Sequence, residues 1–154
     1  MWTNDFCAAT EVNVNVSEIM TTEPIVIEAT QRVRDALEIL SRENIRHLPV
    51  LDEGELRGVL SDRDLRTFLV SDFYDFDAEE AESRLDSRVS EIMIGDVVSV
   101  EPETTVAEVV RMMIDQKFGA LPVVDFSTGE LLGIVSYIDI LRAAEGYFAE
   151  LAGR

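Results

Sequence analysis

The sequence has one cysteine, one histidine and no long apolar run, and each shortage excludes a class of protein. The lone Cys7 cannot form an internal disulfide and provides no metal-ligand spacing. No stretch approaches the roughly 18 apolar residues that a membrane span needs. The amino terminus has no basic segment before an apolar one, as a secretory signal would have. We therefore expect a protein of the reducing cytoplasm that does not insert into a membrane.

Basic residues are also scarce. Thirteen Lys and Arg stand against thirty-one Asp and Glu, which gives a formal net charge of −18 over 154 residues. A nucleic-acid-binding surface needs a basic stripe to neutralise phosphates, and this sequence has none. Charges are screened over about 8 Å at physiological salt, so an arginine in direct contact with a small anion outweighs distant acidic residues. The composition excludes nucleic acid as a partner and leaves small anionic ligands open.

The sequence contains an internal duplication. The five residues at 16–20, Val-Ser-Glu-Ile-Met, return unchanged at 89–93, an offset of 73 that the following positions keep. Repetition at a fixed offset indicates duplicated supersecondary units. Each copy continues with a short apolar strand, an amphipathic segment, a strand that contains Leu-Pro-Val, a turn, a further strand and a closing helix. The repeated 16–20 and 89–93 segments are predicted to pack across the two halves.

The amphipathic segments have apolar residues at i, i+3, i+4 and i+7, which is typical of a helix with one buried face. These residues are Val33, Ala36, Leu37 and Leu40 in the first copy and Val106, Val109, Val110 and Met113 in the second. Thr105 and Glu108 are spaced as a capping box before the second helix. The first copy lacks this pair, and Thr30 is its expected cap.

The Leu-Pro-Val strands contain Pro49 and Pro122, which cannot donate to a strand ladder, so the sequence predicts an edge strand or a break. The last two strands of each copy fit a hairpin, and a right-handed crossover joins the first strand to them. A half of about 50 residues buries too little surface to be stable alone. We predict an α/β (α+β) fold of two β-α-β-β-α repeats, packed through their sheets with pseudo-twofold symmetry.

We divide the chain into an amino-terminal arm (1–15), a first repeat (16–70), an acidic linker (71–88), a second repeat (89–145) and a carboxyl-terminal tail (146–154). The linker combines acidic residues with interleaved aromatics. It fits a solvated segment that extends the preceding helix, and it also fits an element that folds over the module or docks a partner.

The last strand of each copy leads into a Gly-h-h-Ser-x-x-Asp phrase (h, apolar), at 58–64 and 133–139. A strand that runs into a helix leaves backbone N–H groups unpaired and carries a partial positive charge, so it can hold a phosphate. The Asp, one turn in, can accept from sugar hydroxyls. The same spacing describes a capping box, in which Ser caps the helix and Asp returns the bond. Both interpretations stay open on these residues alone.

The doubled unit, the Leu-Pro-Val strand and the repeated phrase resemble tandem CBS domains, the pair called a Bateman module. The resemblance covers residues 16–145, and five motifs carry it in the same order twice. What lies outside is too short for a catalytic domain, so the chain is similar to a stand-alone CBS pair. The resemblance implies a regulatory module that is not an enzyme and requires no cofactor. Its ligand would be AMP, ADP, ATP, S-adenosylmethionine or a related molecule in the cleft between the repeats.

The resemblance also implies two pockets, in which Asp takes the ribose hydroxyls, Ser lies near phosphate and basic residues cross from the opposite repeat. One pocket would combine Asp139, Ser136, Arg46, His47 and Val98. The other would combine Asp64, Ser61, Thr22, Ile25 and Ala120, with Gly119 in place of a facing cation and Arg63 as a substitute. The Asp139 pocket is therefore expected to be the tighter one for a phosphorylated ligand. A homodimer through the 33–40 and 106–113 helical faces and a regulated protein partner are further expectations.

Several of these residues have a second interpretation. His47 can be a packed, hydrogen-bonded structural residue, and Tyr137 is taken as a cover for the sheet edge. Asp62, Asp64 and Asp139 are dispersed and lack histidine support, so no metal site and no catalytic residue are assigned. The competing function is a structural or protein-interaction CBS pair with no nucleotide bound, which the Gly119-Ala120 sequence favours.

Overall fold

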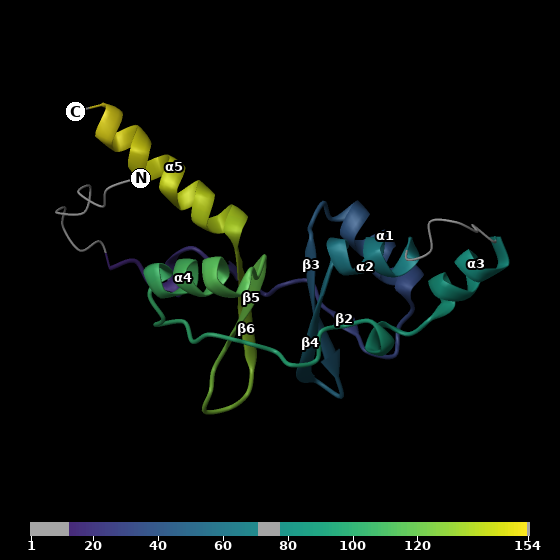
Figure 1. The fold of residues 1–154 in the computed structure, drawn as a ribbon. Coiled ribbons are helices and arrows are strands. Elements are labelled where there is room, and N and C mark those ends of the chain that lie inside the picture. The colour runs from purple at the N-terminus through teal and green to yellow at the C-terminus, as the bar shows by residue number, and fades with distance from the viewer. Residues whose placement is uncertain (1–12, 71–77, 154) are drawn as a thin grey trace.

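The computed structural model describes residues 13–70 and 78–153 (Figure 1). The first repeat contains η1 (Val16–Glu18), β1 (Thr21–Thr22), β2 (Ile27–Glu28), α1 (Val33–Arg42), β3 (His47–Asp52), β4 (Glu55–Ser61) and α2 (Asp62–Leu69). After α3 (Ala78–Asp86), the second contains η2 (Val89–Glu91), α4 (Val106–Gln116), β5 (Ala120–Val124), β6 (Leu131–Ser136) and α5 (Tyr137–Ala152). Most of the predicted arm, at 1–12, and the linker residues 71–77 lie outside the described residues.

Two small sheets lie next to each other in the middle of the molecule, with helices on their outer sides (Figure 1). One sheet has the order β2-β3-β4 and the other β1-β6-β5. In each, the last two strands form an antiparallel hairpin. β2 runs parallel to β3, and a single parallel bridge from Val100 to Val123 takes its place in the second repeat. The predicted fold class of two α/β repeats is confirmed.

The sequence predicted an edge strand or a break at the prolines. The edge strand is wrong for the first repeat, because β3 is the middle strand of its sheet, but the register of β3 and β4 shifts shortly after Pro49, between Val50 and Leu51. Pro49 pairs with Val59 of β4, and the pairing with β2 begins one residue later, at Val50. Proline lacks a hydrogen-bond donor but keeps its acceptor. In the second repeat that acceptor is used, since the carbonyl of Pro122 receives the N–H of Val100 at 3.0 Å.

The repeated 16–20 and 89–93 segments each pack into the core of the opposite repeat. Val16 is fully buried in the cluster that contains Val109, and Val89 is fully buried in the cluster that contains Val33. The strand that follows the first segment, β1, pairs with β6 of the second repeat. The prediction that these segments pack across the two halves is confirmed. We call this arrangement the segment exchange.

The segment exchange explains the glycine that opens each Gly-h-h-Ser-x-x-Asp phrase. A Cβ at Gly58 would lie 2.9 Å from the carbonyl oxygen of Ile94 and 2.8 Å from Sδ of Met93. A Cβ at Gly133 would lie 2.8 Å from the carbonyl oxygen of Thr21. Because the backbone of the exchanged segment is in contact, only a residue without a side chain fits at either position.

The amphipathic helices α1 and α4 form as the periodicity predicts, and they bury their apolar faces inside their own repeats. Val33, Ala36 and Leu40 are buried in one core, and Val109 and Met113 are buried in the other. These helices were the expected dimer surfaces, and Leu37, Val106 and Val110 on them are only partly buried, so the dimer stays a prediction.

The start of each of these helices was also predicted. The Thr105 hydroxyl accepts from the Glu108 N–H at 3.3 Å, as the capping box requires. Thr30 is not the cap of α1. The helix begins at Val33, and the Asp35 carboxylate accepts from the Arg32 N–H at 3.0 Å.

Two segments outside the sequence repeats are helical. In the linker, α3 packs against α1 and α2, so residues 78–86 fold over the first repeat. At the carboxyl end, α5 continues through Gly146 to Ala152, which makes most of the expected tail helical. No helix in the described part of the chain combines the length and apolarity needed to cross a bilayer.

Candidate ligand-binding site

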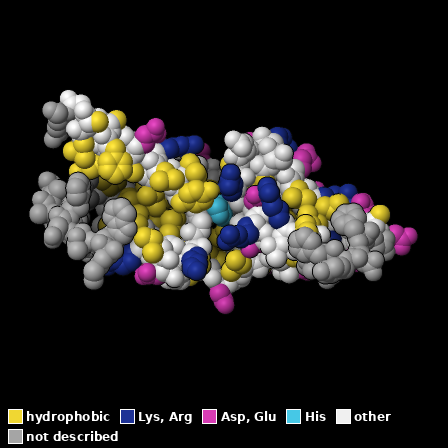
Figure 2. All heavy atoms as spheres, turned by 45° about the horizontal axis from the view of Figure 1, so that its top comes forward, with side chains coloured by type: hydrophobic (Ala, Val, Ile, Leu, Met, Phe, Trp, Pro, Cys, Tyr) yellow, Lys and Arg dark blue, Asp and Glu magenta, His cyan; other side chains and the backbone are white. Residues whose placement is uncertain are grey.

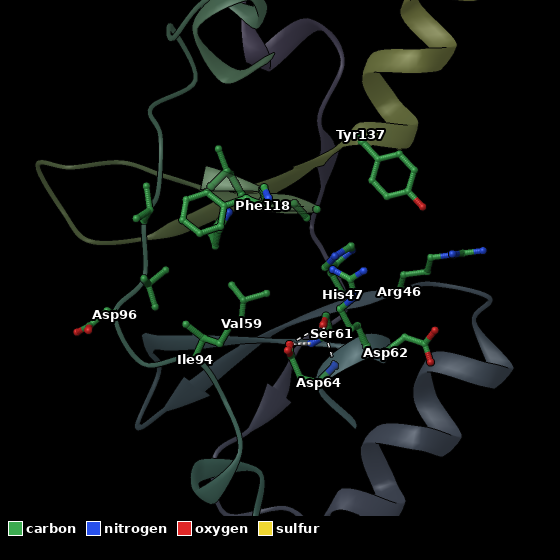
Figure 3. A pocket seen from close by; sticks show the side chains of 18 residues that line it. Arg46, His47, Val59, Ser61, Asp62, Asp64, Ile94, Asp96, Phe118 and Tyr137 are labelled. Carbon is green, nitrogen blue, oxygen red and sulfur yellow. Dashed lines mark hydrogen bonds between the residues drawn. The ribbon is translucent and has the colours of Figure 1, made fainter. Parts of the chain in front are cut away.

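A pocket of about 480 Å³ opens between the two repeats (Figure 3). The first repeat lines it from the end of the β3–β4 hairpin and the start of α2. The other repeat lines it from residues 94–98, which follow η2, and from 117–122 and Tyr137. The site thus depends on both repeats and on their relative position.

The hairpin fixes the first-repeat wall. His47 begins β3 and lies opposite Ser61, the last residue of β4. The backbone carbonyl of Arg46 accepts from the Asp62 N–H at 2.9 Å, which holds the residue before the strand against the start of α2. Arg46, His47 and the Ser61–Asp64 turn therefore form one local unit.

The Ser-x-x-Asp phrase forms a capping box in both repeats. The Asp64 N–H donates to Ser61 Oγ at 3.2 Å, and Asp64 Oδ2 accepts from the Ser61 N–H at 3.1 Å. Ser136 and Asp139 make the same pair of bonds at the start of α5, at 3.4 and 2.8 Å. Within the described residues Asp64 Oδ1 accepts no hydrogen bond. The capping interpretation holds, and one oxygen of Asp64 stays available to a ligand.

His47 reaches across to the opposite repeat. A Cβ at Gly119 would lie 2.5 Å from His47 Nε2, so the imidazole lies directly against this glycine. The ring makes no hydrogen bond with any residue the structure describes, so it is not the hydrogen-bonded structural histidine of the alternative interpretation. Burial is the main reason that the pKa of His47 lies below its usual 6.5, with Arg46 adding to the effect and Asp64 opposing it. The ring is therefore neutral at pH 7.

Basic side chains gather at the pocket although the chain is strongly acidic. Arg46, Arg63 and Lys117 line it together with His47. Figure 2 shows Lys and Arg side chains around the single histidine, which is drawn in cyan. Asp62, Asp64 and Asp96 line the same pocket, so its three cationic side chains are accompanied by three carboxylates. The cations can contact a phosphate directly, and the carboxylates can accept from hydroxyl groups of a ligand.

Lys117 is the facing cation that the sequence analysis did not find. It is the only lysine in the chain and comes from the second repeat, whereas Gly119 is the residue that aligns with Arg46. Lys117 ends α4 in a left-handed conformation (φ 59°, ψ 33°), which favours Gly or Asn. Asn44 holds the corresponding position of the first repeat, at φ 52°. The sequence could have pointed to Lys117, because a lysine at the end of a helix, where Gly or Asn is favoured, is unusual.

The other end of the pocket is apolar. Val59, Ile94 and Phe118 surround it, and Asp96 lies at its edge (Figure 3). Aliphatic and aromatic side chains of this kind can sandwich a planar base. Arg46 lies on the other side of the pocket from Asp96 (Figure 3).

The structure groups the predicted site residues differently from the sequence analysis. Val98, expected with Asp139, lines the same pocket as Asp64. The reason is the segment exchange: Ile94 bridges Val59 of β4 and Val100 bridges Val123 of β5, so the stretch between them crosses from the first repeat to the second along this pocket. Thr22 pairs in the same way with Gly133 of β6, which leads to Asp139.

The predicted residues that line this pocket are Arg46, His47, Ser61, Asp64, Val98 and Ala120. Those that do not line it are Ser136, Asp139, Thr22 and Ile25, which come from the ends of β6, α5 and β1 and from the extended segment before β2. Tyr137, taken as a cover for the sheet edge, is part of the lining. Among the described residues, no three His, Cys, Asp or Glu side chains converge as metal ligands.

Comparisons with known proteins agree with this architecture. The family described as CBS domain matches residues 16–71 and 89–146. A CBS domain-containing protein of Dictyostelium discoideum is 34% identical over 135 residues, which cover 84% of this chain and 90% of that protein.

Two solved structures share the fold. The CBS domain pair of protein MJ0100, in complex with 5′-methylthioadenosine and S-adenosyl-L-methionine, superposes with a TM-score of 0.72 at 27% identity, over 88% of this chain and 98% of that one. CBSX2 in complex with AMP, a protein of Arabidopsis thaliana, superposes with a TM-score of 0.71 at 29% identity, over 86% and 97%.

Proposed function

The chain belongs to the CBS-domain family, and on this basis we propose that it is a regulatory ligand-sensing module whose inter-repeat pocket binds an adenine nucleotide. The observation that carries the proposal is that Arg46 and Lys117, from opposite repeats, line one cavity together with Asp64, whose Oδ1 accepts no hydrogen bond from the described residues. The MJ0100 and CBSX2 complexes support an adenosine-containing ligand, since both are CBS pairs bound to one.

The pocket suggests how the ligand lies. The base occupies the apolar end between Ile94 and Phe118, and the free Oδ1 of Asp64 accepts from the ribose hydroxyls. The phosphate reaches the cationic end, where Arg46 comes from one repeat and Lys117 from the other. We therefore assign the tighter site to the Asp64 pocket, in place of the Asp139 pocket that the sequence favoured.

A ligand that contacts both repeats can regulate their relative position. A phosphate held by Arg46 and Lys117 binds best at one separation of the repeats. A ligand shifts an arrangement only to the extent that it binds its two forms differently. The nucleotide would thus favour one angle between the repeats, and a partner protein that senses this angle would respond to nucleotide concentration.

The competing function, a CBS pair that binds nothing, drew support from Gly119 in place of a cation. That glycine makes room for His47, and the cation stands two residues earlier as Lys117. The feature that favoured an empty cleft therefore fits an occupied one equally well.

The test is a thermal-shift and calorimetric titration with AMP, ADP, ATP, S-adenosylmethionine and NAD. A ligand at 100 times its dissociation constant should stabilise the chain by about 2.7 kcal/mol. No shift with any of the five would contradict the proposal, and nucleotide turnover would contradict a purely binding role.

Matched variants locate the site. Arg46→Ala and Lys117→Ala should each weaken binding of the best phosphorylated ligand about tenfold or more, because a charge-assisted hydrogen bond is worth about 1.5–3 kcal/mol. Arg42→Ala is the control, since Arg42 pairs with Glu38 and Glu43 on the outer helix. Losses at Asp139→Ala that exceed those at Asp64→Ala would move the site to the other end of the cleft.

A further inference from the structure

Lys117 carries the only side-chain amine of this chain. The sequence has thirteen Lys and Arg residues, and all except Lys117 are arginines. A deprotonated amine is a nucleophile, whereas a guanidinium group stays protonated in proteins. Lys117 is exposed, lines the inter-repeat pocket and makes no ion pair with any residue in the described ranges 13–70 and 78–153. Its amine is therefore open to a reagent that enters the pocket.

The backbone at Lys117 favours a different residue type. Its left-handed conformation (φ 59°) suits Gly or Asn, and Asn44 occupies the corresponding position of the first repeat. Lys117 belongs to neither hydrophobic core cluster, so an asparagine there would relieve the backbone without loss of packing. A residue that persists in a sparsely populated conformation points to a role of its side chain. For Lys117 that role lies in the pocket.

Lys117 also decides the charge of the pocket. The cations and carboxylates of the lining are equal in number, so their formal charges cancel: Arg46, Arg63 and Lys117 against Asp62, Asp64 and Asp96. Acylation turns a lysine ammonium into a neutral amide, and of the three cations only Lys117 can undergo it. Acylated Lys117 would leave the pocket with an excess of negative charge and without the cation that faces Arg46 from the opposite repeat.

We propose that Lys117 is an acylation site, that its acyl donor is a small acyl phosphate, and that acylation lowers the affinity of the pocket for phosphorylated ligands. The inference deepens the proposed function and rests on it. The class of donor follows from the lining of the pocket. Arg46 and Arg63 can hold the phosphate group of an acyl phosphate as they would hold that of a nucleotide. The carbonyl carbon of the bound donor is then held near the amine that lines the same pocket.

The acyl transfer needs no other reagent. The Lys117 ammonium first loses a proton to water, and the amine nitrogen attacks the carbonyl carbon of the donor. A C–N bond forms as the C–O bond to the phosphate breaks. Inorganic phosphate leaves with the electron pair of that bond and takes up the second proton from nitrogen. No atom is oxidised or reduced, and the product is an amide on Lys117.

The first test incubates the full chain with acetyl phosphate in a mildly alkaline buffer and locates the acetyl groups by peptide mass spectrometry. Lys117 should be acetylated. Arg46→Ala should slow the reaction about tenfold or more, because it removes a charge-assisted contact with the phosphate. Arg42→Ala is the control and should leave the rate unchanged, since Arg42 pairs with Glu38 and Glu43 on the outer helix.

Two further arms separate binding of the donor from exposure of the amine. The N-hydroxysuccinimide ester of acetate contains no phosphate, so it should acetylate the wild type and Arg46→Ala at the same rate. Inorganic phosphate should slow acetylation of the wild type by acetyl phosphate, a result that requires no variant. Far-ultraviolet circular dichroism checks that the variants fold.

The second test measures the affinity for AMP and ATP by calorimetry before and after acetylation of the same sample. Acetylation should weaken binding of the tighter nucleotide about tenfold or more. Lys117→Arg is the matched control, because its cation cannot be acetylated and its affinity should not change on treatment. This variant also controls for acetylation of the α-amino group.

Three results would each overturn the inference alone: no acetyl group on Lys117, equal rates with acetyl phosphate for the wild type and Arg46→Ala, or unchanged nucleotide affinity after acetylation. An untreated chain that binds neither AMP nor ATP would overturn the proposed function, and this inference with it, because there would be no affinity to lower.

Discussion

Gly58 and Gly133 lie where the exchanged segments contact the β-hairpins. Gly146 lies on α5, where an added Cβ would have free space. A methyl group at either hairpin glycine meets backbone carbonyl oxygen at under 3 Å, whereas at Gly146 no atom beyond the adjacent residues and the backbone of α5 itself lies within 4 Å. We expect Gly58→Ala and Gly133→Ala to lower the free energy of unfolding by about 1–3 kcal/mol through overpacking. Gly146→Ala should raise it by about 0.5–1 kcal/mol, because alanine is the better helix former.

Urea unfolding of the three variants measures this difference. If all three changes shift stability in the same direction, the close approach of the exchanged segments does not determine the hairpin glycines.

His47 should make stability depend on pH. Its folded pKa lies below the unfolded value of 6.5, chiefly because of burial. The unfolded chain therefore binds more protons than the folded one as pH falls below about 6.5, and the stabilisation is complete only above this value. Unfolding free energies measured between about pH 7.5 and 5.5 should fall more for the wild type than for His47→Gln. Identical pH profiles would mean that burial of the ring does not oppose its protonation.

The residues of the site show what sequence motifs can and cannot supply. Ser61 and Asp64 were predicted from the repeated phrase, and Arg46 and His47 from their place before the Leu-Pro strand. Lys117 was missed because no motif aligns it with Arg46. Val98 was predicted but assigned to the wrong carboxylate, because the segment exchange is a property of the tertiary fold and leaves no trace in local spacing.

At the scale of elements, α3 is held on the first repeat by an ion-pair clasp. Arg34 of α1 donates to Glu82 at 2.8 Å and to Asp86 at 2.7 Å, and Arg32 approaches Asp86 at 2.8 Å. The hydrogen bond from Arg34 is the main reason that the pKa of Asp86 lies below its usual range. Because these groups are exposed, the clasp orders α3 without contributing much to global stability.

Arg34→Ala should therefore speed amide hydrogen exchange in α3 several-fold and leave the urea midpoint of the whole chain almost unchanged. Salt should have a similar effect on the wild type, since it screens exposed ion pairs. Arg42→Ala removes an arginine from the same helix without touching α3 and serves as the control. Equal exchange in the two variants would show that apolar contacts such as Leu85 alone hold the helix.

The elements themselves followed from the sequence to different degrees. The i, i+3, i+4, i+7 pattern located α1 and α4 because each buries a full apolar face. α3 has no fully buried residue, so its composition was indistinguishable from that of a solvated linker. Gly146 suggested a helix end, yet α5 continues past it because nothing nearby requires the chain to turn.

At the scale of the molecule, the segment exchange means that a sequence repeat and a hydrophobic core do not contain the same residues. The first sequence repeat ends near residue 70, but its core is completed by Val89, Ile92 and Met93. We expect a fragment of residues 24–94, which contains this whole core, to show helical circular dichroism and a cooperative thermal transition. A fragment of residues 16–71 matches the sequence repeat but lacks the core segment, so it should remain largely unfolded.

The two fragments share residues 24–71 and differ in which exchanged segment they contain and in the linker with α3. Equal folding of both would mean that the exchanged segment is dispensable to the core it enters.

The same arrangement sets an order of events on the ribosome. Residues 16–20 are made well before their partners in the core of the second repeat, which run from Val98 to Ile140. The first repeat, by contrast, can close as soon as residue 93 has emerged. The segment at 16–20 must therefore wait, with its apolar side chains out of contact with their core, until the residues up to Ile140 have emerged.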